Sequence, residues 1–390
     1  LIDYTQGLYP VIKSYKYPKV GTTNSAVRIG VVSVKGGKTK WIDTNDDLRN
    51  NYIPRMGWIP ETSKLVIQRM NRLQNTNRLM VTEISSGWFG GVKATELETI
   101  ITEKDDAWVD VHDNLKWINK GKRFTWTSER DGWRHMYMVT TKTGSAALLT
   151  PGEYDVISVQ KIDIEGGWVY YIASPDDPTQ RYLYRTAMDG SGKTERLTPE
   201  NQPGTHSYQI SKDAKWAIHT YSNLNKPNVI DMGSLPGHTS ARMLEDNDEL
   251  KEKFNALTKG TSEFFRIEIE DGVELDGYCM RPSHFDPSKK YPLLVYVYGE
   301  PAAQTARDTW QGDKGLWHRM LAEEGYIVIN MDNRGTPAPR GRKWRKCIYE
   351  QIGILASADQ AAAVKQGRCM GLERRRVHDS QRPVPLSGPL

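Results

Sequence analysis

The chain has 390 residues, of which 53 are Lys or Arg, 48 are Asp or Glu, and 38% are hydrophobic. This composition excludes an intrinsically disordered chain and predicts two folded bodies. Three cysteines, Cys279, Cys347 and Cys369, are too few and too far apart for a disulfide framework or a zinc module, so we expect neither a metal nor a cofactor. The sequence has no apolar run of about 18 residues and therefore predicts no membrane span.

The net charge of +5 is concentrated at the end of the chain. Residues 367–390 contain five arginines against Glu373 and Asp379, a net of +3, which leaves only +2 for the other 366 residues. A chain without a basic stripe over most of its length is not expected to bind nucleic acid. The internal basic run from Arg334 to Lys346 is expected to be a solvated loop.

The first half of the chain repeats a pattern of apolar residues, a polar turn and a strand. The tripeptide Leu149-Thr150-Pro151, for example, recurs 48 positions later as Leu197-Thr198-Pro199. Short β-rich runs at this spacing are typical of a β-propeller, which has about four strands in each blade. We count about four blades between residues 41 and 248, with part of another before them. Because a closed propeller needs about four to eight blades, we expect further blades upstream of Leu1.

The pattern changes near residue 250, where a charged helical segment precedes alternating strands and helices. Such alternation predicts an open α/β sheet. Two strands should form a hairpin around Asp271-Gly272, and two later strands, apolar on both faces, should be buried in a parallel sheet. The predicted strands are 264–270, 273–280, 292–298 and 326–331, and the predicted helices are 250–257, 317–325 and 359–366.

Four motifs resemble the dipeptidyl peptidase IV type of the prolyl oligopeptidase family, in its bacterial form. They are Thr127-Ser-Glu-Arg-Asp-Gly-Trp-Arg-His-Met-Tyr137 in a blade, residues 282–292, Tyr291-Pro-Leu-Leu-Val-Tyr-Val-Tyr-Gly-Glu-Pro301, and Met331-Asp-Asn-Arg-Gly-Thr336. The resemblance implies a partial, all-β propeller over residues 1–250 and a truncated α/β-hydrolase domain over residues 251–366. It also implies a serine exopeptidase that releases N-terminal dipeptides ending in Pro or Ala from peptide substrates.

The residues that would perform this chemistry are mostly missing. The family's nucleophile lies on a Gly-x-Ser-x-Gly turn, which this chain lacks, and its Asp and His partners follow later in the chain. Ser191 lies in a blade turn and has the wrong spacing. By resemblance, Tyr298 is the residue that donates a hydrogen bond to the oxyanion; without the resemblance it reads as a core tyrosine at a strand end. We therefore expect a chain that is inactive as it stands.

The segment 367–390 reads as an unstructured, frameshifted tail. When the residues from Met370 to Val377 are read one nucleotide forward, permitted codons can encode Trp-Gly-Trp-Ser-Gly-Gly-Gly, the family's nucleophile motif. Two alternatives stay open: a non-catalytic propeller that binds peptides or acts as a scaffold, and another propeller peptidase such as an acylaminoacyl peptidase. The resemblance implies a periplasmic or cell-surface location and a homodimer, although this chain lacks part of the family's dimer surface.

Overall fold

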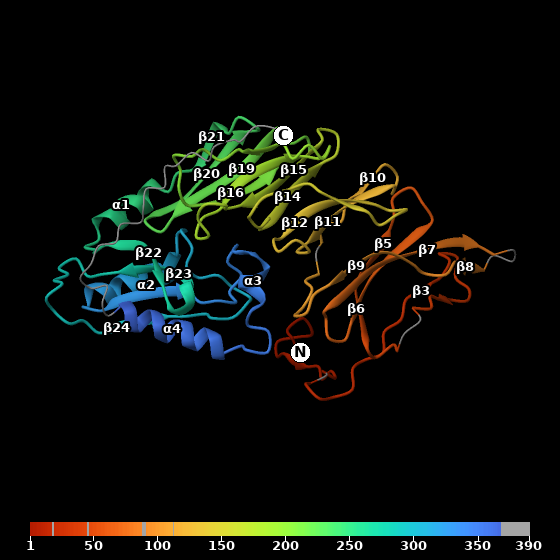
Figure 1. Ribbon diagram of the computed structural model, residues 1–390, viewed down its shortest axis with the longest axis horizontal. Helices are drawn as coiled ribbons and strands as arrows, with labels where there is room; N and C mark the ends of the chain where they lie inside the picture. The colour runs from red at the N-terminus through yellow and green to blue at the C-terminus, as the bar shows by residue number, and fades with distance from the viewer. Residues whose placement is uncertain (18, 45–46, 88–90, 112, 368–390) are drawn as a thin grey trace. The chain divides into compact units, whose positions relative to one another are not determined.

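A computed structural model describes residues 1–390 except 18, 45–46, 88–90, 112 and 368–390 (Figure 1). Contacts within the chain define two compact units. The first contains residues 1–125 and 139–146, and the second contains residues 126–138 and 147–390. The change of pattern near residue 250 lies inside the second unit, so the predicted domain boundary there stays a prediction.

Four antiparallel sheets, each with four or five strands, follow one another between residues 51 and 245 (Figure 1). This number agrees with the four blades expected from the sequence. Two pairs of very short strands precede them: β1 (Ile2–Asp3) with β2 (Val11–Ile12), and β3 (Gly30–Val31) with β4 (Lys40–Trp41). The sheets are β5 (Asn51–Trp58), β6 (Lys64–Asn71), β7 (Thr76–Ser86), β8 (Val92–Ala94) and β9 (Glu98–Lys104); β10 (Trp117–Ile118), β11 (Arg123–Ser128), β12 (His135–Thr140) and β13 (Ala146–Leu148); β14 (Ser158–Asp163), β15 (Trp168–Ala173), β16 (Tyr182–Ala187) and β17 (Thr194–Arg196); and β18 (Thr205–Ile210), β19 (Trp216–Asn223), β20 (Lys226–Ser234) and β21 (Thr239–Glu245).

The repeated Leu-Thr-Pro tripeptide has the same structural role in two of these sheets. Thr150 Oγ1 accepts a hydrogen bond of 3.0 Å from the backbone N–H of Met136, and Thr198 Oγ1 accepts one of 2.8 Å from Leu183. Both threonines are buried, as are the leucines before them. Because buried backbone N–H groups need partners, each threonine completes the hydrogen bonding of its sheet where the regular strand ends. The sequence repeat is therefore a structural repeat.

The rest of the second unit alternates strands and helices, as predicted. Its sheet has the order β22-β23-β25-β24, in which β22, β23 and β25 pair antiparallel and β24 pairs parallel with β25. The predicted hairpin is confirmed, with Gly272 in its turn at a φ of 69°. The elements are α1 (Asp248–Ala256), β22 (Ser262–Glu268), β23 (Glu274–Met280), β24 (Leu293–Tyr296), α2 (Gly312–Glu323), β25 (Ile327–Asp332), α3 (Gly341–Lys346) and α4 (Ile354–Gly367).

Helices cover both faces of this sheet. Val328 of β25 packs in a cluster with Ala322 of α2, whereas its neighbour Ile329 packs in a cluster with Ala363 of α4. Successive side chains of a strand point to opposite faces, so α2 and α4 lie on opposite sides of β25. The buried side chains of β25 confirm the prediction of an internal strand for residues 326–331.

The prediction of complete burial is wrong for residues 292–298. β24 ends at Tyr296 and is the edge strand of the described sheet, and Leu293, Val297 and Tyr298 are each more than 40% exposed. An apolar sequence shows that a strand can be buried but does not supply the neighbour that would cover it. Among the described residues, no helix is long and apolar enough to cross a membrane.

Candidate functional site

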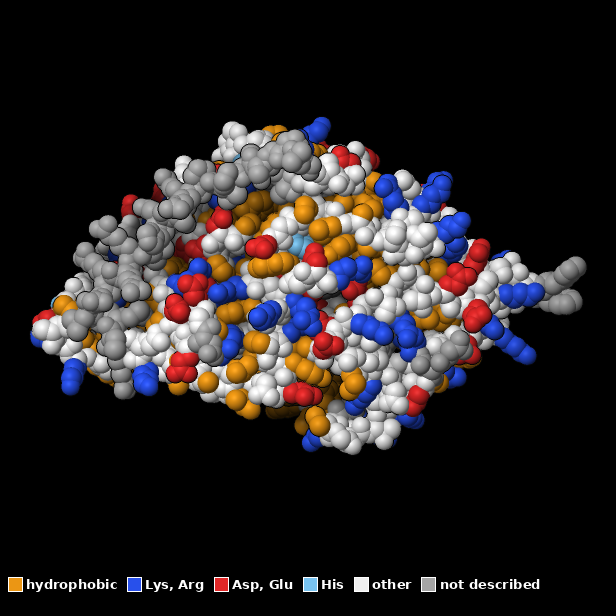
Figure 2. Space-filling view, in the orientation of Figure 1, with side chains coloured by type: hydrophobic (Ala, Val, Ile, Leu, Met, Phe, Trp, Pro, Cys, Tyr) orange, Lys and Arg blue, Asp and Glu red, His pale blue; other side chains and the backbone are white. Residues whose placement is uncertain are grey.

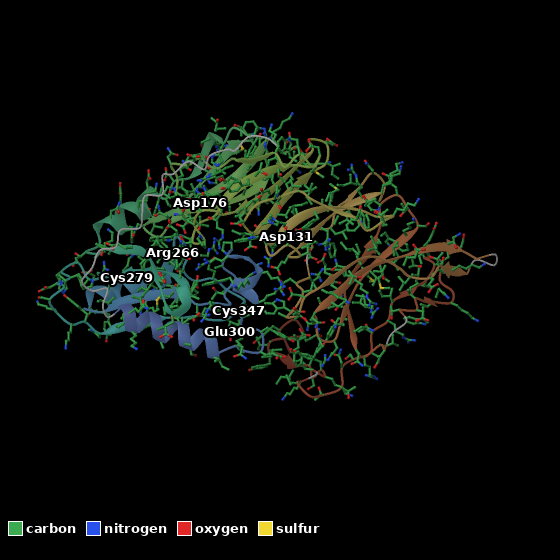
Figure 3. All side chains as sticks on the ribbon, in the orientation of Figure 1. Asp131, Asp176, Arg266, Cys279, Glu300 and Cys347 are labelled. Carbon is green, nitrogen blue, oxygen red and sulfur yellow. The ribbon has the colours of Figure 1, made fainter. Side chains whose placement is uncertain are left out.

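The candidate site lies at the carboxyl ends of β24 and β25. Because the two strands are parallel, both chains leave the sheet at the same edge, which is where α/β proteins usually place ligand-binding groups. Tyr298 lies two residues beyond β24, with 44% of its surface exposed, and Asp332-Asn333-Arg334 follows β25. Glu300, labelled in Figure 3, marks the loop that begins after Tyr298. The sequence-predicted Tyr298 is thus an accessible phenol at a strand end and is not a core residue.

Asn333 holds the two strand ends together. Its Nδ2 donates a hydrogen bond of 3.2 Å to the carbonyl of Gly299, the residue after Tyr298, and one of 2.7 Å to the carbonyl of Arg334. Gly299 has a φ of 78°, a conformation that residues with a Cβ rarely adopt. The buried Asn333 side chain therefore sets the direction of the backbone immediately after Tyr298.

Asp332 orders the loop that follows Tyr298. Its carboxylate accepts hydrogen bonds of 2.9 Å from the backbone N–H groups of Thr305 and Ala306, and one of 3.0 Å from the Thr305 hydroxyl. Burial raises the pKa of Asp332, and these hydrogen bonds oppose that shift because they favour the ionised carboxylate. Asp332 is only 2% exposed, so its carboxylate does not face the solvent. It is therefore a positioning residue for the loop.

The same loop is attached to two blades. The backbone N–H of Asp308 donates a hydrogen bond of 2.9 Å to the carbonyl of Thr179, and its carboxylate accepts one of 2.8 Å from the backbone N–H of Leu224. Arg181 contacts the side-chain oxygen of Gln304. The segment that follows Tyr298 is thus held between the mixed sheet and the blade turns of the same unit.

The basic run from Arg334 to Lys346 is not a solvated loop, and that prediction is wrong. The Arg334 guanidinium forms a bidentate pair with Asp359 of α4, with a shortest distance of 2.7 Å, and Asp359 is only 1% exposed. Further along, Arg345 and Lys346 are also buried. Counting charges along the sequence missed these positions because their acidic partners lie 25 to 217 residues away in the chain.

Helix α3 is fixed to the turn between β11 and β12 by a buried ionic cluster. Arg345 contacts the carboxylates of Glu129 and Asp155, and Lys346 Nζ lies 2.6 Å from Glu129 Oε2. All four side chains are less than 9% exposed. Figure 3 labels Asp131, in the turn between β11 and β12, and Cys347, the residue that follows α3. Glu129 belongs to a motif noted in the sequence, but nothing in the sequence identified its partners.

The two backbones also approach each other directly in this cluster. The N–H of Arg342 donates a hydrogen bond of 2.8 Å to the carbonyl of Gly132, and the N–H of Gly341 donates one of 2.8 Å to Asp155. Gly341 has a φ of 81°, and a Cβ built there would lie 3.1 Å from the Gly132 carbonyl oxygen. Only glycine fits this position without strain.

Other polar residues that could serve in a site have structural surroundings. His135 is 1% exposed and lies 3.0 Å from the carbonyl of Gly152, which is typical of a structural histidine. Ser191 is in the exposed turn between β16 and β17, where its N–H bonds to Asp189. Asp110 accepts a hydrogen bond of 3.2 Å from the Trp108 indole, and His112 lies outside the described residues. Among the residues with described positions, no group of three or more His, Cys, Asp or Glu is arranged to hold a metal.

The charged surface follows the even distribution seen in most of the sequence. On the face shown in Figure 2, lysine and arginine side chains of the described residues lie among acidic and apolar ones, and no continuous basic stripe is seen on that face. The absence of a nucleic-acid partner remains a prediction based on the charge distribution.

Comparison with known proteins identifies the class of this fold. Residues 1–228 match the family model described as the dipeptidyl peptidase IV N-terminal region. The chain is 31% identical over 372 residues to a probable dipeptidyl-aminopeptidase B of Emericella nidulans and 29% identical over 376 residues to a probable dipeptidyl peptidase 4 of the same organism. In both comparisons 92% of this chain is covered, but only 40% and 47% of the relatives.

A solved structure agrees with this match. The crystal structure of Porphyromonas gingivalis dipeptidyl peptidase 4 superposes with a TM-score of 0.79 and 32% sequence identity, covering 93% of this chain and 49% of that one. The chain belongs to the dipeptidyl peptidase IV family and has the propeller-type sheets of its N-terminal region. It spans about half the length of the relatives that it matches.

Proposed function

We propose that this chain is the propeller-bearing part of a dipeptidyl peptidase IV-like serine exopeptidase, together with the beginning of its α/β-hydrolase domain. The observation that carries the proposal is the shared edge of β24 and β25, from which Tyr298 and the Asp332-Asn333-Arg334 loop extend. In this family member, that edge comes after the blade sheets in the chain. Tyr298 would donate its phenolic hydrogen to the oxyanion of the tetrahedral intermediate. The residue is 44% exposed, which supports this role.

The substrate class in this proposal is peptides with Pro or Ala at the second position, from which an N-terminal dipeptide is released. The 390-residue chain itself would not catalyse this reaction, because its sequence has no Gly-x-Ser-x-Gly nucleophile turn. Without a nucleophile, an oxyanion donor alone cannot start acyl transfer. We expect no hydrolysis of Gly-Pro-p-nitroanilide and no covalent labelling by a fluorophosphonate; either signal from the purified chain would contradict the proposed inactivity.

A hybrid chain tests the proposed activity itself. Residues 1–366 would replace the corresponding residues of the full-length Porphyromonas gingivalis enzyme, so that the hybrid keeps that enzyme's own upstream and downstream segments, and hydrolysis of Gly-Pro-p-nitroanilide would be measured. We expect turnover, and we expect Tyr298→Phe to lower kcat by about 100- to 1000-fold, the usual effect of removing one oxyanion donor. Tyr326→Phe, at the opposite end of the parallel strands, is the matched control. A folded hybrid without turnover, or equal losses in both variants, would contradict the proposal.

The tail is part of the same proposal. We infer that the codons for residues 367–390 are read in a shifted frame, since the neighbouring frame can encode the nucleophile motif in order. Resequencing the coding DNA around Gln366 tests this directly. Codons that cannot encode Trp-Gly-Trp-Ser-Gly-Gly-Gly in the neighbouring frame would refute it.

A further inference from the structure

A row of three hydrogen bonds crosses the last blade sheet, in the second unit; its strands β19, β20 and β21 are labelled in Figure 1. His206 of β18 lies with its Nε2 2.9 Å from the carbonyl oxygen of Gln202. Its Nδ1 lies 2.8 Å from Nε2 of His219 of β19, and Nδ1 of His219 lies 2.8 Å from Oδ1 of Asp231 of β20. Both imidazoles are buried. The four groups therefore form one continuous chain, which we call the histidine row.

The number of hydrogens in the histidine row can be counted. Each of the three contacts needs one hydrogen between its two heavy atoms, and two neutral imidazoles supply only two. The row ends in oxygen acceptors on both sides, a carbonyl and a carboxylate, so no tautomer of two neutral rings satisfies all three contacts. A third hydrogen is required, either as an imidazolium or on the Asp231 carboxyl.

The ring geometry agrees with true hydrogen bonding between the two histidines. The ring planes of His206 and His219 differ by only 5° and the ring centres are 5.1 Å apart, so the rings meet edge to edge in nearly one plane. Tyr221 stacks on the face of His206 at 4.6 Å, and Tyr208 stacks on that of His219 at 4.7 Å. Aromatic faces attract a cation, so this packing also favours a charged imidazole pair.

Opposing electrostatic effects act on the histidine row. Burial lowers the pKa of His206 to about 3 and also lowers that of His219, whereas the hydrogen bond that His219 donates to Asp231 acts to raise the pKa of His219. The three short contacts favour the protonated row over the neutral row that burial alone would favour. Without the extra hydrogen, one buried pair of acceptors would face each other below 3 Å, and the Asp231 charge would lack a counter-charge in the row. Besides the members of the row, the titratable and charged groups that face it are Tyr182, Arg196, Tyr208, Tyr221 and His238.

We propose that the histidine row holds one shared proton in the folded protein at neutral pH and makes the last blade sensitive to alkaline pH. Loss of the proton removes one of the three bonds that join β18, β19 and β20 to the Gln202 turn. The consequence has a definite sign. Above about pH 6.5 the unfolded histidines are mostly neutral, so the folded state binds more protons and its stability falls as pH rises.

Asp231→Asn separates this proposal from a neutral histidine row. An asparagine amide can donate to His219 Nδ1, after which two neutral rings complete all three bonds without an extra proton. We expect the unfolding equilibrium constant of the parent chain to rise nearly tenfold for each pH unit between 7 and 8.5, and that of Asp231→Asn to show no such rise. His284→Gln, which changes an exposed histidine, should keep the parent's dependence.

Nitrogen NMR of the native full-length chain, labelled with ¹⁵N-histidine, gives a reading that does not require reversible unfolding. At pH 7.5 the parent should show nitrogen shifts of one imidazolium that is absent in Asp231→Asn. Two neutral rings in the parent, or the same pH slope in the parent and Asp231→Asn, would overturn the proposal. A stability that instead falls only below pH 6.5 would show that burial, and not the hydrogen count, controls the row.

Discussion

Arg345 is a cation enclosed by two buried carboxylates, and its removal leaves both of them without their main partner. Arg345→Met keeps most of the side-chain volume but removes the cation that Glu129 and Asp155 share, while Lys346 stays beside Glu129; breaking a buried ion pair typically costs about 3–5 kcal/mol. Urea unfolding followed by circular dichroism measures this loss. Lys343→Met removes the same charge from an exposed position of the same helix and should change the free energy of unfolding by less than about 0.5 kcal/mol. Equal effects of the two substitutions would show that the cluster adds no stability.

Glu129 gives the same cluster a dependence on acid. Burial raises its pKa, but the charges of Arg345 and Lys346 more than offset this, and the result is a pKa of about 2. Because the folded pKa is below the unfolded value, the carboxylate stabilises the fold above about pH 4.5 and loses this contribution as pH falls towards 2. The contribution is about 3 kcal/mol at neutral pH. Glu129→Gln should reduce the slope of unfolding free energy against pH between 5 and 2; an unchanged slope would contradict the assignment.

At the scale of the elements, we predict that replacing one of the repeated threonines lowers the stability of its sheet. Thr198 Oγ1 accepts a hydrogen bond from the buried N–H of Leu183 and lies 2.7 Å from the hydroxyl of Tyr208. Thr198→Val keeps the shape of the side chain but removes this oxygen from both groups. An unsatisfied buried group costs about 1–3 kcal/mol. Thermal unfolding should therefore shift to lower temperature. Thr239→Val, at the exposed start of β21, is the control and should leave the transition unchanged.

The sequence predicts the elements better than it predicts their surroundings. The Leu-Thr-Pro repeat and the turn at Asp271-Gly272 identify strands because their causes are local: a hydroxyl next to a strand and a backbone that needs φ above zero. Helix α3 was missed because Gly341 and the basic residues after it favour a loop when considered alone. Only the distant Glu129 and Asp155 make that segment a buried helix.

The candidate site divides in the same way. The position of Tyr298 after a strand follows from the apolar run before it, together with the family resemblance. Its contact partners do not, because Asn333, Asp332 and Thr305 come together only through the parallel pairing of β24 and β25. The histidine row was also missed, since hydrogen bonds between adjacent strands depend on a register that the sequence does not state.

At the scale of the whole molecule, β24 makes a prediction about association. Among the described strands it has a neighbour on one side only, beside exposed apolar side chains, and such edges tend to pair with other chains. We expect the isolated chain to associate at micromolar concentration, detected by light scattering. Leu293→Lys places a charge on this edge and should slow association several-fold. Val34→Lys adds the same charge at a fully exposed position outside the named strands and should not; a monodisperse parent chain would contradict the prediction.

The missing side chain at Gly341 has a mechanical consequence. The N–H of Gly341 bonds to the carboxylate of Asp155, between β13 and β14, and the N–H of Arg342 bonds to the carbonyl of Gly132, between β11 and β12. The start of α3 is therefore tied to two blade loops at once, and a displacement of α3 from either loop would break one of these bonds. Gly341→Ala would place a Cβ 3.1 Å from the Gly132 carbonyl oxygen and should weaken this attachment without changing any charge.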